Sequence, residues 1–483
     1  MRLSTLTAEV VAGRDPEIAG LTADSRAVAP GFLFAALPGV NADGGAFVAD
    51  ALKKGAAAVL ASPSTRERIA NDVAAVVDPN PRQRLAQIAA RFYGKQPETI
   101  VAVTGTNGKT SIASFVRQIW TQLGSRAASL GTVGVVTEAK TWPLSHTTPD
   151  PIEIHRILAE LASDGIQHLA FEASSHGLAQ YRVDGVRPKA AAFTNLTRDH
   201  LDYHPTFEAY EQAKLRLFAE VLPNDGAAVL NADSPAAAAF AKVARARWQR
   251  LVMVGENGHD LKLLKRSPRG DGQHLVVRWE QREYDIELPL AGAFQASNAL
   301  IAAALVLSLG GDIERVFCAL ATIKGAPGRL EKVAASPKGA PIYVDYAHTP
   351  NAIETVLQAL RPHTDGKLWI VFGCGGDRDP GKRPLMGAAA ARYADRVIVT
   401  DDNPRGEDAA LIRRAVMTKV NGASEIGDRA KAIETAISSL EARDVLVIAG
   451  KGHETGQIIG GETKPFNDAE VARATAARLA RAS

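Results

Sequence analysis

Several residues with chemically active side chains lie together in a short polar loop that could bind phosphate groups. Residues 104–111 read Thr-Gly-Thr-Asn-Gly-Lys-Thr-Ser. Glycines let backbone N–H groups approach phosphate oxygens, Lys109 supplies a mobile cation, and Thr110 offers a hydroxyl group to Mg²⁺. The spacing from glycine to lysine is shorter than in the usual phosphate-binding motif, and a plain turn between a strand and a helix is the alternative. We predict a nucleotide-phosphate site.

Two further groups of residues could bind divalent metal ions. Glu172 lies in the strand-like run 168–173 and precedes Ser-Ser-His-Gly, so we expect it at the end of a strand. An acid there, near a phosphate loop, is a typical Mg²⁺ ligand, although a carboxylate that caps the next turn is the alternative. His200, Asp202 and His204 alternate along the chain, and an extended segment could aim them to one side. Either a second metal site or a polar loop fits that pattern.

The segment 207–221 has helical periodicity and carries an unusual lysine. Lys214 lies on the apolar stripe of this helix, one turn after Tyr210 and one turn before Phe218. Such a lysine often extends its ammonium group to the surface, and periodicity alone favours this. If the ammonium group stays buried, its pKa falls and the amine becomes nucleophilic. That amine could take up CO₂ as a carbamate, which would be a carboxylate-like ligand for Mg²⁺.

Polar loops that could bind ligands follow several strand-like segments in the last third of the chain. Asp345 ends one such segment and could accept a ribose hydroxyl. The loops 375–379 and 401–407 each contain an arginine, which can form a two-pronged contact with a carboxylate. Each loop taken singly is equally consistent with a solvated turn. Because the polar clusters come after strands, they fall where open α/β sheets bind ligands.

The phosphate loop requires a strand before it and a helix after it. Residues 99–103 are β-branched and apolar, which predicts a buried strand. Apolar residues then recur at helical spacing over 112–123, and Gly124 ends this helix. Glycine and proline clusters at 94–97 and 325–328 mark the limits of this region. We therefore predict a central ATP-binding domain over residues 96–326, built on a parallel sheet.

The flanking regions predict two further α/β domains. Strand-like runs at 33–37 and 56–61 and a helix at 82–93 indicate a small N-terminal α/β domain, residues 1–95. Beyond residue 327, strand–loop–helix units repeat, which predicts a doubly wound, Rossmann-like C-terminal domain over 327–483.

Composition excludes several classes of protein. The chain of 483 residues is 46% hydrophobic and 23% charged, with a net charge of +3, so no general surface for nucleic acid or membranes is expected. Cys318 and Cys374 lack metal-binding spacing, which fits a reducing cytoplasm. The apolar stretch 299–309 is too short to span a membrane, and Glu9 interrupts any signal-peptide core. We expect a cytoplasmic monomer that binds small molecules.

Ordered motifs along the chain resemble those of the Mur ligases, enzymes of bacterial cell-wall synthesis. In chain order they are TGTNGKTS, EASSHGL, TNLTRDHLDYH, AKLRLF, GAFQASNAL, GAPGRLE, VDYAHTP, GCGGDRDPGKRP and DDNPRGE. The DSR and PGVNADG segments extend the resemblance into the N-terminal domain. The motifs are most similar to those of the branch that adds meso-diaminopimelate. His146 departs from the asparagine that relatives often have before the Thr-Thr pair.

The resemblance implies an ADP-forming amide ligase of peptidoglycan precursor synthesis. ATP would phosphorylate the D-glutamyl carboxylate of UDP-MurNAc-L-Ala-D-Glu, and the amine of meso-diaminopimelate would attack the acyl phosphate. This chemistry brings anions together, so a field from lysine and Mg²⁺ is needed. Water must be excluded, and hinged domains would allow closure over the substrates.

The resemblance also implies roles for individual residues. The catalytic residues would be Lys109, Glu172, His200 and Lys214. The metal ligands would be Thr110, Glu172, His200 and Lys214 as a carbamate, which replaces the surface interpretation of Lys214. ATP would be bound by Gly105, Thr106, Asn107, Gly108, Lys109, Thr110, Ser111, Asn298, Arg329 and Asp345. The UDP-MurNAc-dipeptide would be bound by Ser25, Val40, Asn41, Ala42, Thr147, Thr148, Ser174, Gln180 and Arg182. Diaminopimelate would be bound by Arg378, Asp402, Asn403, Pro404, Arg405, Gly450 and Glu454.

Other functions make different predictions. A lysine-adding ligase or a folylpolyglutamate-type synthetase is disfavoured by the 402–405 loop and by the full-length N-terminal domain. A nucleotide-hydrolysing switch would not depend on an amino acid. A protein that only binds UDP-sugars would leave Lys109, Glu172 and Lys214 unexplained.

Overall fold

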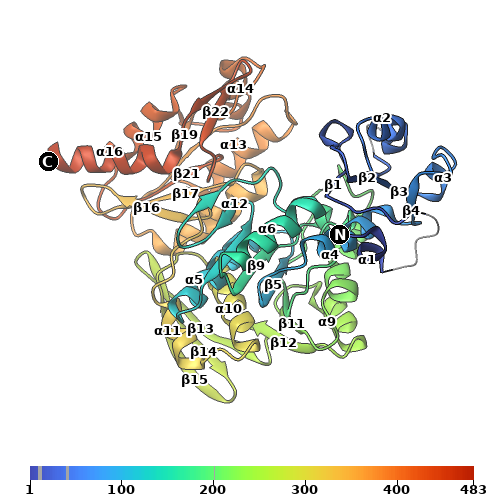
Figure 1. Ribbon diagram of the computed structural model, residues 1–483. Helices are drawn as coiled ribbons and strands as arrows, with labels where there is room; N and C mark the ends of the chain where they lie inside the picture. The colour runs from blue at the N-terminus through green and yellow to red at the C-terminus, as the bar shows by residue number, and fades with distance from the viewer. Residues whose placement is uncertain (9–13, 40–42, 201, 483) are drawn as a thin grey trace. The chain divides into compact units, whose positions relative to one another are not determined.

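The computed structural model describes residues 1–8, 14–39, 43–200 and 202–482. It is an α/β structure with two compact units, one of residues 1–109 and 120–252 and the other of residues 110–119 and 253–483 (Figure 1). Helix α5 (Lys109–Gln122) belongs partly to each unit. Within the described ranges, no helix is long and apolar enough to cross a membrane.

The N-terminal segment forms the small α/β layer that the sequence predicts. Its parallel strands are ordered β1 (Gly20–Thr22), β2 (Phe32–Ala36), β3 (Ala58–Ala61) and β4 (Ala74–Val77). Alternate residues of a strand point to opposite faces, so Leu33 and Leu60 pack with one apolar cluster and Phe34 and Val59 with another. The helices and turns of this layer are α1 (Leu3–Thr7), η1 (Ser25–Ala27), η2 (Gly44–Phe47), α2 (Val48–Lys53), α3 (Pro63–Arg66) and α4 (Pro81–Tyr93).

The phosphate loop leaves the middle of a second sheet in the same unit. The parallel strands run in the order β11 (Ala227–Asn231), β10 (Ala190–Phe193), β5 (Thr99–Thr104), β9 (His168–Glu172) and β6 (Ala127–Gly131). The predicted parallel sheet is confirmed there, but it ends in two unpredicted antiparallel strands, β7 (Gly134–Val136) and β8 (Thr141–Trp142).

Helices around these strands carry several predicted site residues. Gly124, at φ +90, follows α5, as expected of a helix-ending glycine. The helix predicted over 207–221 is α-helical only in its first part, α8 (Phe207–Arg216), and continues as the π-helix η3 (Leu217–Val221). The remaining helices of this unit are α6 (Pro151–Ser163), α7 (Ser175–Ala179) and α9 (Ala237–Ala246).

The second unit contains a set of strands that the sequence analysis missed. Strand β12 (Arg250–Gly255) pairs with β13 (Leu261–Arg269), which continues antiparallel into β14 (Gly272–Trp279) and β15 (Arg282–Leu288). The apolar stretch 299–309 lies mostly in α10 (Ala293–Ser308), whose side chains are almost all buried, as predicted. Helix α11 (Ile313–Leu320) follows it.

The C-terminal sheet is doubly wound, as predicted. Its strands are ordered β16 (Glu331–Ala335), β17 (Pro341–Asp345), β21 (Val445–Ala449), β18 (Leu368–Phe372), β19 (Arg396–Val399) and β20 (Ser424–Glu425), and only β16 is antiparallel to its neighbour. Val447 packs with α12 (Pro350–Leu360), α13 (Lys382–Tyr393) and α14 (Ala409–Met417). Ile448 packs on the other face with α15 (Arg429–Ser438) and α16 (Asp468–Ala482).

Candidate functional site

The phosphate loop is shaped by two glycines and by the segment that follows β10. Gly105 and Gly108 have φ values of +142 and +91, which favour glycine. A Cβ atom on Gly105 would lie 1.9 Å from Thr194 Oγ1, so no side chain fits there. Thr194 Oγ1 donates to the Asn107 carbonyl at 2.6 Å, and Asn195 Oδ1 accepts from the Asn107 N–H at 3.0 Å. The loop is therefore held in place before any ligand binds.

Two lysines share one carbonyl oxygen of this loop. Lys109 Nζ donates to the Gly105 carbonyl at 2.9 Å, and Lys214 Nζ donates to the same oxygen at 2.8 Å. Lys214 is only 1% exposed, and its ammonium group lies 4.3 Å from the centre of the Tyr210 ring. Burial, and then the charge of Lys109, hold the pKa of Lys214 well below its ordinary value, with Asp199 opposing. The surface position favoured by periodicity alone is therefore wrong.

The predicted acid Glu172 ends β9 and is buried. Its two carboxylate oxygens accept from the backbone N–H and the hydroxyl group of Thr132, at 2.7 and 3.2 Å. Thr148 Oγ1 donates to the Glu172 carbonyl at 2.7 Å and accepts from the Ser174 N–H at 3.0 Å. Sequence reasoning missed Thr132. The glycine before it was the available signal, because a Cβ atom on Gly131 would overlap the Glu172 carboxylate.

Most residues predicted to hold the muramoyl dipeptide form one network around Glu172. Arg182 Nη1 donates to the Thr148 carbonyl at 2.7 Å, and Arg182 Nε donates to Gln180 Oε1 at 3.1 Å. Gln180 Nε2 donates to the hydroxyl oxygen of Tyr203 at 3.0 Å. The hydroxyl groups of Thr147 and Thr132 lie 3.1 Å apart. The structure thus brings together five predicted residues from different segments: Thr147, Thr148, Ser174, Gln180 and Arg182.

The predicted uridine contacts lie in the N-terminal layer. Ser25 begins the turn η1, and its carbonyl accepts from Lys54 Nζ at 2.9 Å. Val40, Asn41 and Ala42 lie outside the described residues. Their predicted role stays a prediction.

The histidines after β10 form an aromatic cluster with His176 of α7. The ring of His176 lies 5.0 Å from His200, 5.7 Å from His204 and 4.1 Å from Tyr203, measured between centroids. Burial, and then the two neighbouring histidines, lower the pKa of His176 to about 4. Residues 202–206 form turns and bends, with His204 buried and Asp202 exposed, so the extended segment that could aim these side chains to one side is not found there. In the described part of the chain, no three His, Cys, Asp or Glu residues gather into a metal site.

The predicted nucleotide contacts of the second unit are connected through Gln295. Asn298 Nδ2 donates to Gln295 Oε1 at 3.3 Å, and Gln295 Nε2 donates to the Arg329 carbonyl at 2.9 Å. The Arg329 guanidinium lies 4.7 Å from the centre of the Tyr346 ring. Two backbone N–H groups, each at 2.7 Å, hold the carboxylate of Asp345. Burial raises the pKa of Asp345, and Arg329 opposes that rise.

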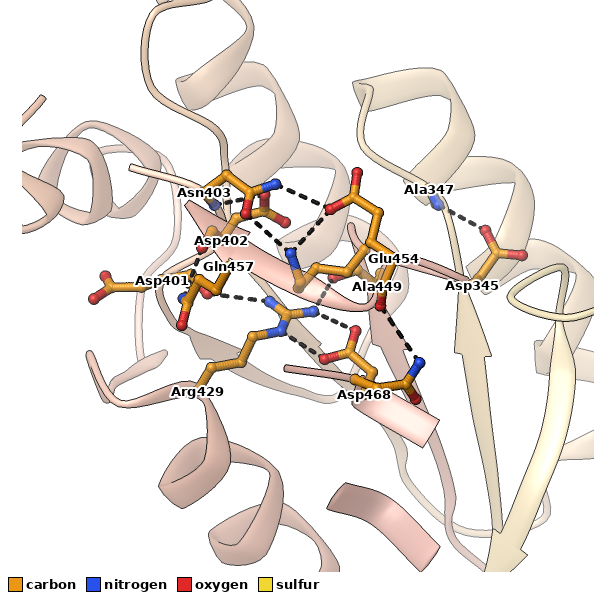
Figure 2. Close-up of polar contacts among 12 residues, drawn as sticks. Asp345, Ala347, Asp401, Asp402, Asn403, Arg429, Ala449, Glu454, Gln457 and Asp468 are labelled. Atoms are coloured by element: carbon orange, nitrogen blue, oxygen red, sulfur yellow. Dashed lines mark hydrogen bonds and ion pairs between the residues drawn. The ribbon is translucent and has the colours of Figure 1, made fainter. Parts of the chain in front are cut away.

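The predicted diaminopimelate residues come from loops that follow β18, β19 and β21. Figure 2 shows Asn403 and Glu454 joined by a hydrogen bond, in which Asn403 Nδ2 donates to Glu454 Oε2 at 3.0 Å. Gly450 has φ +115, and a Cβ atom there would lie 2.7 Å from Asp402 Oδ2. The side chain of Lys451 is buried against both Asn403 and Glu454. Lys451 was not predicted as a site residue.

The two arginine loops lie against each other. The Gly376 N–H donates to the Asn403 carbonyl at 2.9 Å, and Arg405 Nη1 donates to the Gly376 carbonyl at 2.8 Å. Arg405 has φ +53, an uncommon value for a side chain of this size. Arg378, in the first loop, is exposed, and its guanidinium has no hydrogen-bond partner among the described residues.

A buried ion pair beneath these loops was also missed by the sequence analysis. Arg429 and Asp468 both have 0% exposed side chains and form a two-pronged contact. Arg429 also donates to the carbonyl groups of Asp401, at 3.2 Å, and Ala449, at 2.9 Å (Figure 2). The pair opens helices α15 and α16, where charged residues are common, so the sequence carries no signal of its burial.

We expect Arg429→Met to lower the free energy of unfolding by about 3–5 kcal/mol, because it leaves the Asp468 carboxylate buried without a cation. Urea denaturation of the full chain measures this change. Arg478→Met is the matched control, since Arg478 pairs with Glu434 between the same two helices but in an exposed position. Equal stability of the two variants would contradict the expectation.

Comparisons with known proteins identify the family of this chain. Family models match three successive segments: "Mur ligase family, catalytic domain" at 17–93, "Mur ligase middle domain" at 103–306, and "Mur ligase, glutamate ligase domain" at 328–452. A Brucella melitensis protein named UDP-N-acetylmuramoyl-L-alanyl-D-glutamate–2,6-diaminopimelate ligase is 54% identical over 464 residues, covering 96% of this chain and 95% of that protein. The chain belongs to the Mur ligase family.

Other relatives of this Mur ligase also match over nearly the whole chain. A Caulobacter vibrioides protein of the same name is 55% identical over 460 residues, with 94% of each chain covered. A solved structure of a ligase with that name has a TM-score of 0.76 at 34% identity and covers 99% of both chains. The three-domain α/β fold expected from the motifs is confirmed. The domain limits 1–95, 96–326 and 327–483 stay a prediction.

Proposed function

We propose that this Mur ligase joins meso-2,6-diaminopimelate to UDP-N-acetylmuramoyl-L-alanyl-D-glutamate at the expense of ATP. ATP phosphorylates the D-glutamyl carboxylate, the amine of diaminopimelate attacks the acyl phosphate, and ADP and phosphate are released. The observation that carries the proposal is the pair of relatives named for this reaction, at 54% and 55% identity over nearly the whole chain. A cytoplasmic location and a monomeric state stay predictions.

The residues around the phosphate loop suit the first step of this reaction. Lys109 Nζ donates to the carbonyl groups of Gly105 and Thr106, so it is already at the loop. From this position the phosphates of ATP can attract it. In the same unit, Arg182 and Gln180 form a polar network with Thr148 that suits a carboxylate-bearing substrate. These groups support roles in which one lysine neutralises phosphate charge while the arginine network orients the dipeptide.

We infer that Glu172, His200 and a carbamate on Lys214 would hold Mg²⁺, and the role of Thr110 stays a prediction. Mg²⁺ usually takes only a few protein ligands and fills its coordination sphere with water and substrate phosphates. The donors would be the buried carboxylate of Glu172, the imidazole of His200 and an oxygen of the carbamate, so their chemistry is compatible with such an ion. When bound, the metal neutralises charge between the carboxylate and the phosphate.

Phosphate release tests the proposal. The protein is incubated with ATP, Mg²⁺ and the UDP-MurNAc-dipeptide, and single amino acids are added in turn. We expect release that depends on the dipeptide and on meso-diaminopimelate, with L-lysine a poor substitute. Release on ATP alone would indicate a nucleotide-hydrolysing switch, whereas a preference for lysine or glutamate would place the chain in another branch.

A further inference from the structure

A buried lysine without an assigned role lies between the loops of the proposed diaminopimelate site. Lys451 follows β21, and 0% of its side chain is exposed. A buried ammonium group is costly unless charged or polar partners surround it. Lys451 Nζ donates to Asn403 Oδ1 at 3.0 Å and to Glu454 Oε2 at 2.9 Å. Its partners therefore come from the loop after β19 and from its own loop.

These contacts fix the orientation of both partners. Asn403 Oδ1 also accepts from the backbone N–H of Ile458 at 3.0 Å, and Asn403 Nδ2 donates to Glu454 Oε2 at 3.0 Å. With two donors at its oxygen and an acceptor at its nitrogen, the Asn403 amide has one favourable orientation. Glu454 Oε2 thus receives two hydrogen bonds from inside the protein.

The other oxygen of Glu454 is left for a ligand. The Glu454 side chain is 32% exposed, and no donor in the described part of the chain bonds to its Oε1. The far end of diaminopimelate carries an ammonium group beside its carboxylate. An ammonium group needs acceptors, and a carboxylate oxygen is a strong one because the hydrogen bond is charge-assisted.

We propose that Lys451 is a positioning residue for the amino-acid substrate: it holds Oε2 of Glu454 in place and leaves Oε1 to accept from the ligand's distal ammonium group. The inference deepens the proposed function and rests on it, because it takes the ligand to be diaminopimelate. Lys451 acts through Glu454 and Asn403 and does not itself contact the reacting atoms. Removal of Lys451 leaves Glu454, which is partly exposed and can be hydrated. We therefore expect diaminopimelate binding to be weakened more than folding.

Lys451→Met is the direct test, because methionine keeps an apolar stem and removes the charge. We expect the KM for meso-diaminopimelate to rise about ten- to hundred-fold, while the KM for ATP and kcat at saturating diaminopimelate stay near the parent values. Lys464→Met, at an exposed lysine of the hairpin β22 (Gly456–Ile459) and β23 (Glu462–Pro465), is the matched control and should change none of these. If Lys451→Met does not fold, Lys451→Gln replaces it with the same expectation.

A double-mutant cycle separates positioning from a general structural effect. If Lys451 acts through Glu454, the double variant Lys451→Met/Glu454→Gln should raise the KM for diaminopimelate no further than Glu454→Gln alone. Additive effects, or an unchanged KM in Lys451→Met, would overturn the inference. A parent protein that releases no phosphate when diaminopimelate is added would instead refute the proposed function, so the two failures are distinguishable.

Discussion

Lys214→Ala is expected to reduce ligase activity by about 10²- to 10³-fold, the typical effect of losing one preorganised electrostatic group. The Lys214 ammonium group shares the Gly105 carbonyl with Lys109, and both cations lie close to one oxygen. Conversion of Lys214 to a carbamate replaces this repulsion between cations with attraction between unlike charges. It also supplies an anionic oxygen ligand for Mg²⁺, which alanine cannot provide.

Two measurements test the carbamate. Activity of Lys214→Ala should recover in part when bicarbonate or a small carboxylic acid is added, whereas Lys214→Arg, which keeps a cation but cannot form a carbamate, should stay inactive. Independently of activity, ¹³C NMR of the protein in ¹³C-bicarbonate should show a carbamate signal that is absent from Lys214→Ala. Lys451 is the internal comparison, because that buried lysine donates to the carboxylate of Glu454 and we expect no carbamate signal from it.

Two outcomes would contradict the expectation for Lys214. One is an alanine variant with nearly full activity. The other is a carbamate signal that persists in Lys214→Ala, which would place the modification elsewhere in the chain.

Arg405→Ala is expected to raise the KM for diaminopimelate about thirty- to several-thousand-fold, with little change in the KM for ATP. Truncating one partner of a buried charge pair typically costs about 2–5 kcal/mol. Arg405 Nη1 is held by the Gly376 carbonyl at 2.8 Å, so the guanidinium is oriented before the substrate arrives. L-Lysine has no distal carboxylate for Arg405 to bind. The preference for diaminopimelate over lysine, measured as the ratio of their kcat/KM values, should therefore fall, mainly because diaminopimelate binds less well.

A glycine at position 405 separates the role of the Arg405 side chain from that of its backbone conformation. Its φ of +53 is held by ladder-like contacts: its N–H donates to the Ile458 carbonyl at 3.0 Å, and its carbonyl accepts from the Gly460 N–H at 2.8 Å. Arg405→Gly should bind diaminopimelate as poorly as Arg405→Ala but unfold at higher urea concentration, because glycine adopts this φ without strain. If both variants keep the parent KM, the 402–405 loop is not the selector and Arg378 becomes the leading candidate.

Local patterns predicted most of the elements around the site. The strand, loop and helix at 99–123 could be located because buried strands, glycines and helical spacing are properties of neighbouring residues. The Thr132 contact with Glu172 could not be predicted. Thr132 follows β6 and Glu172 ends β9, and these two strands become neighbours only when the sheet forms. The antiparallel strands β13 to β15 were missed because alternating exposed strands resemble polar loops in composition.

The burial of charged side chains was the other feature that could not be predicted from the sequence. Periodicity places Lys214 on an apolar stripe but does not say whether its ammonium group reaches water, and the structure puts it inside. Arg429 and Asp468 are 39 residues apart, and their pairing depends on how α15 and α16 meet. The Mur ligase resemblance assigned roles to residues that touch substrates, but it gave no account of the side chains that support them.

Beyond its contact with Asp468, the hydrogen bonds that Arg429 donates to other described residues go to two main-chain carbonyl groups, those of Asp401 and Ala449. A carbonyl group is present whatever side chain the residue carries, so this support is indifferent to mutation of the residues it supports. A substitution at Asp401 or Ala449 that leaves the backbone in place would therefore keep both of these hydrogen bonds, during evolution or in directed selection for a new amino acid. This backbone support is separate from the side-chain contacts of Asn403 and Lys451, which a substitution would remove.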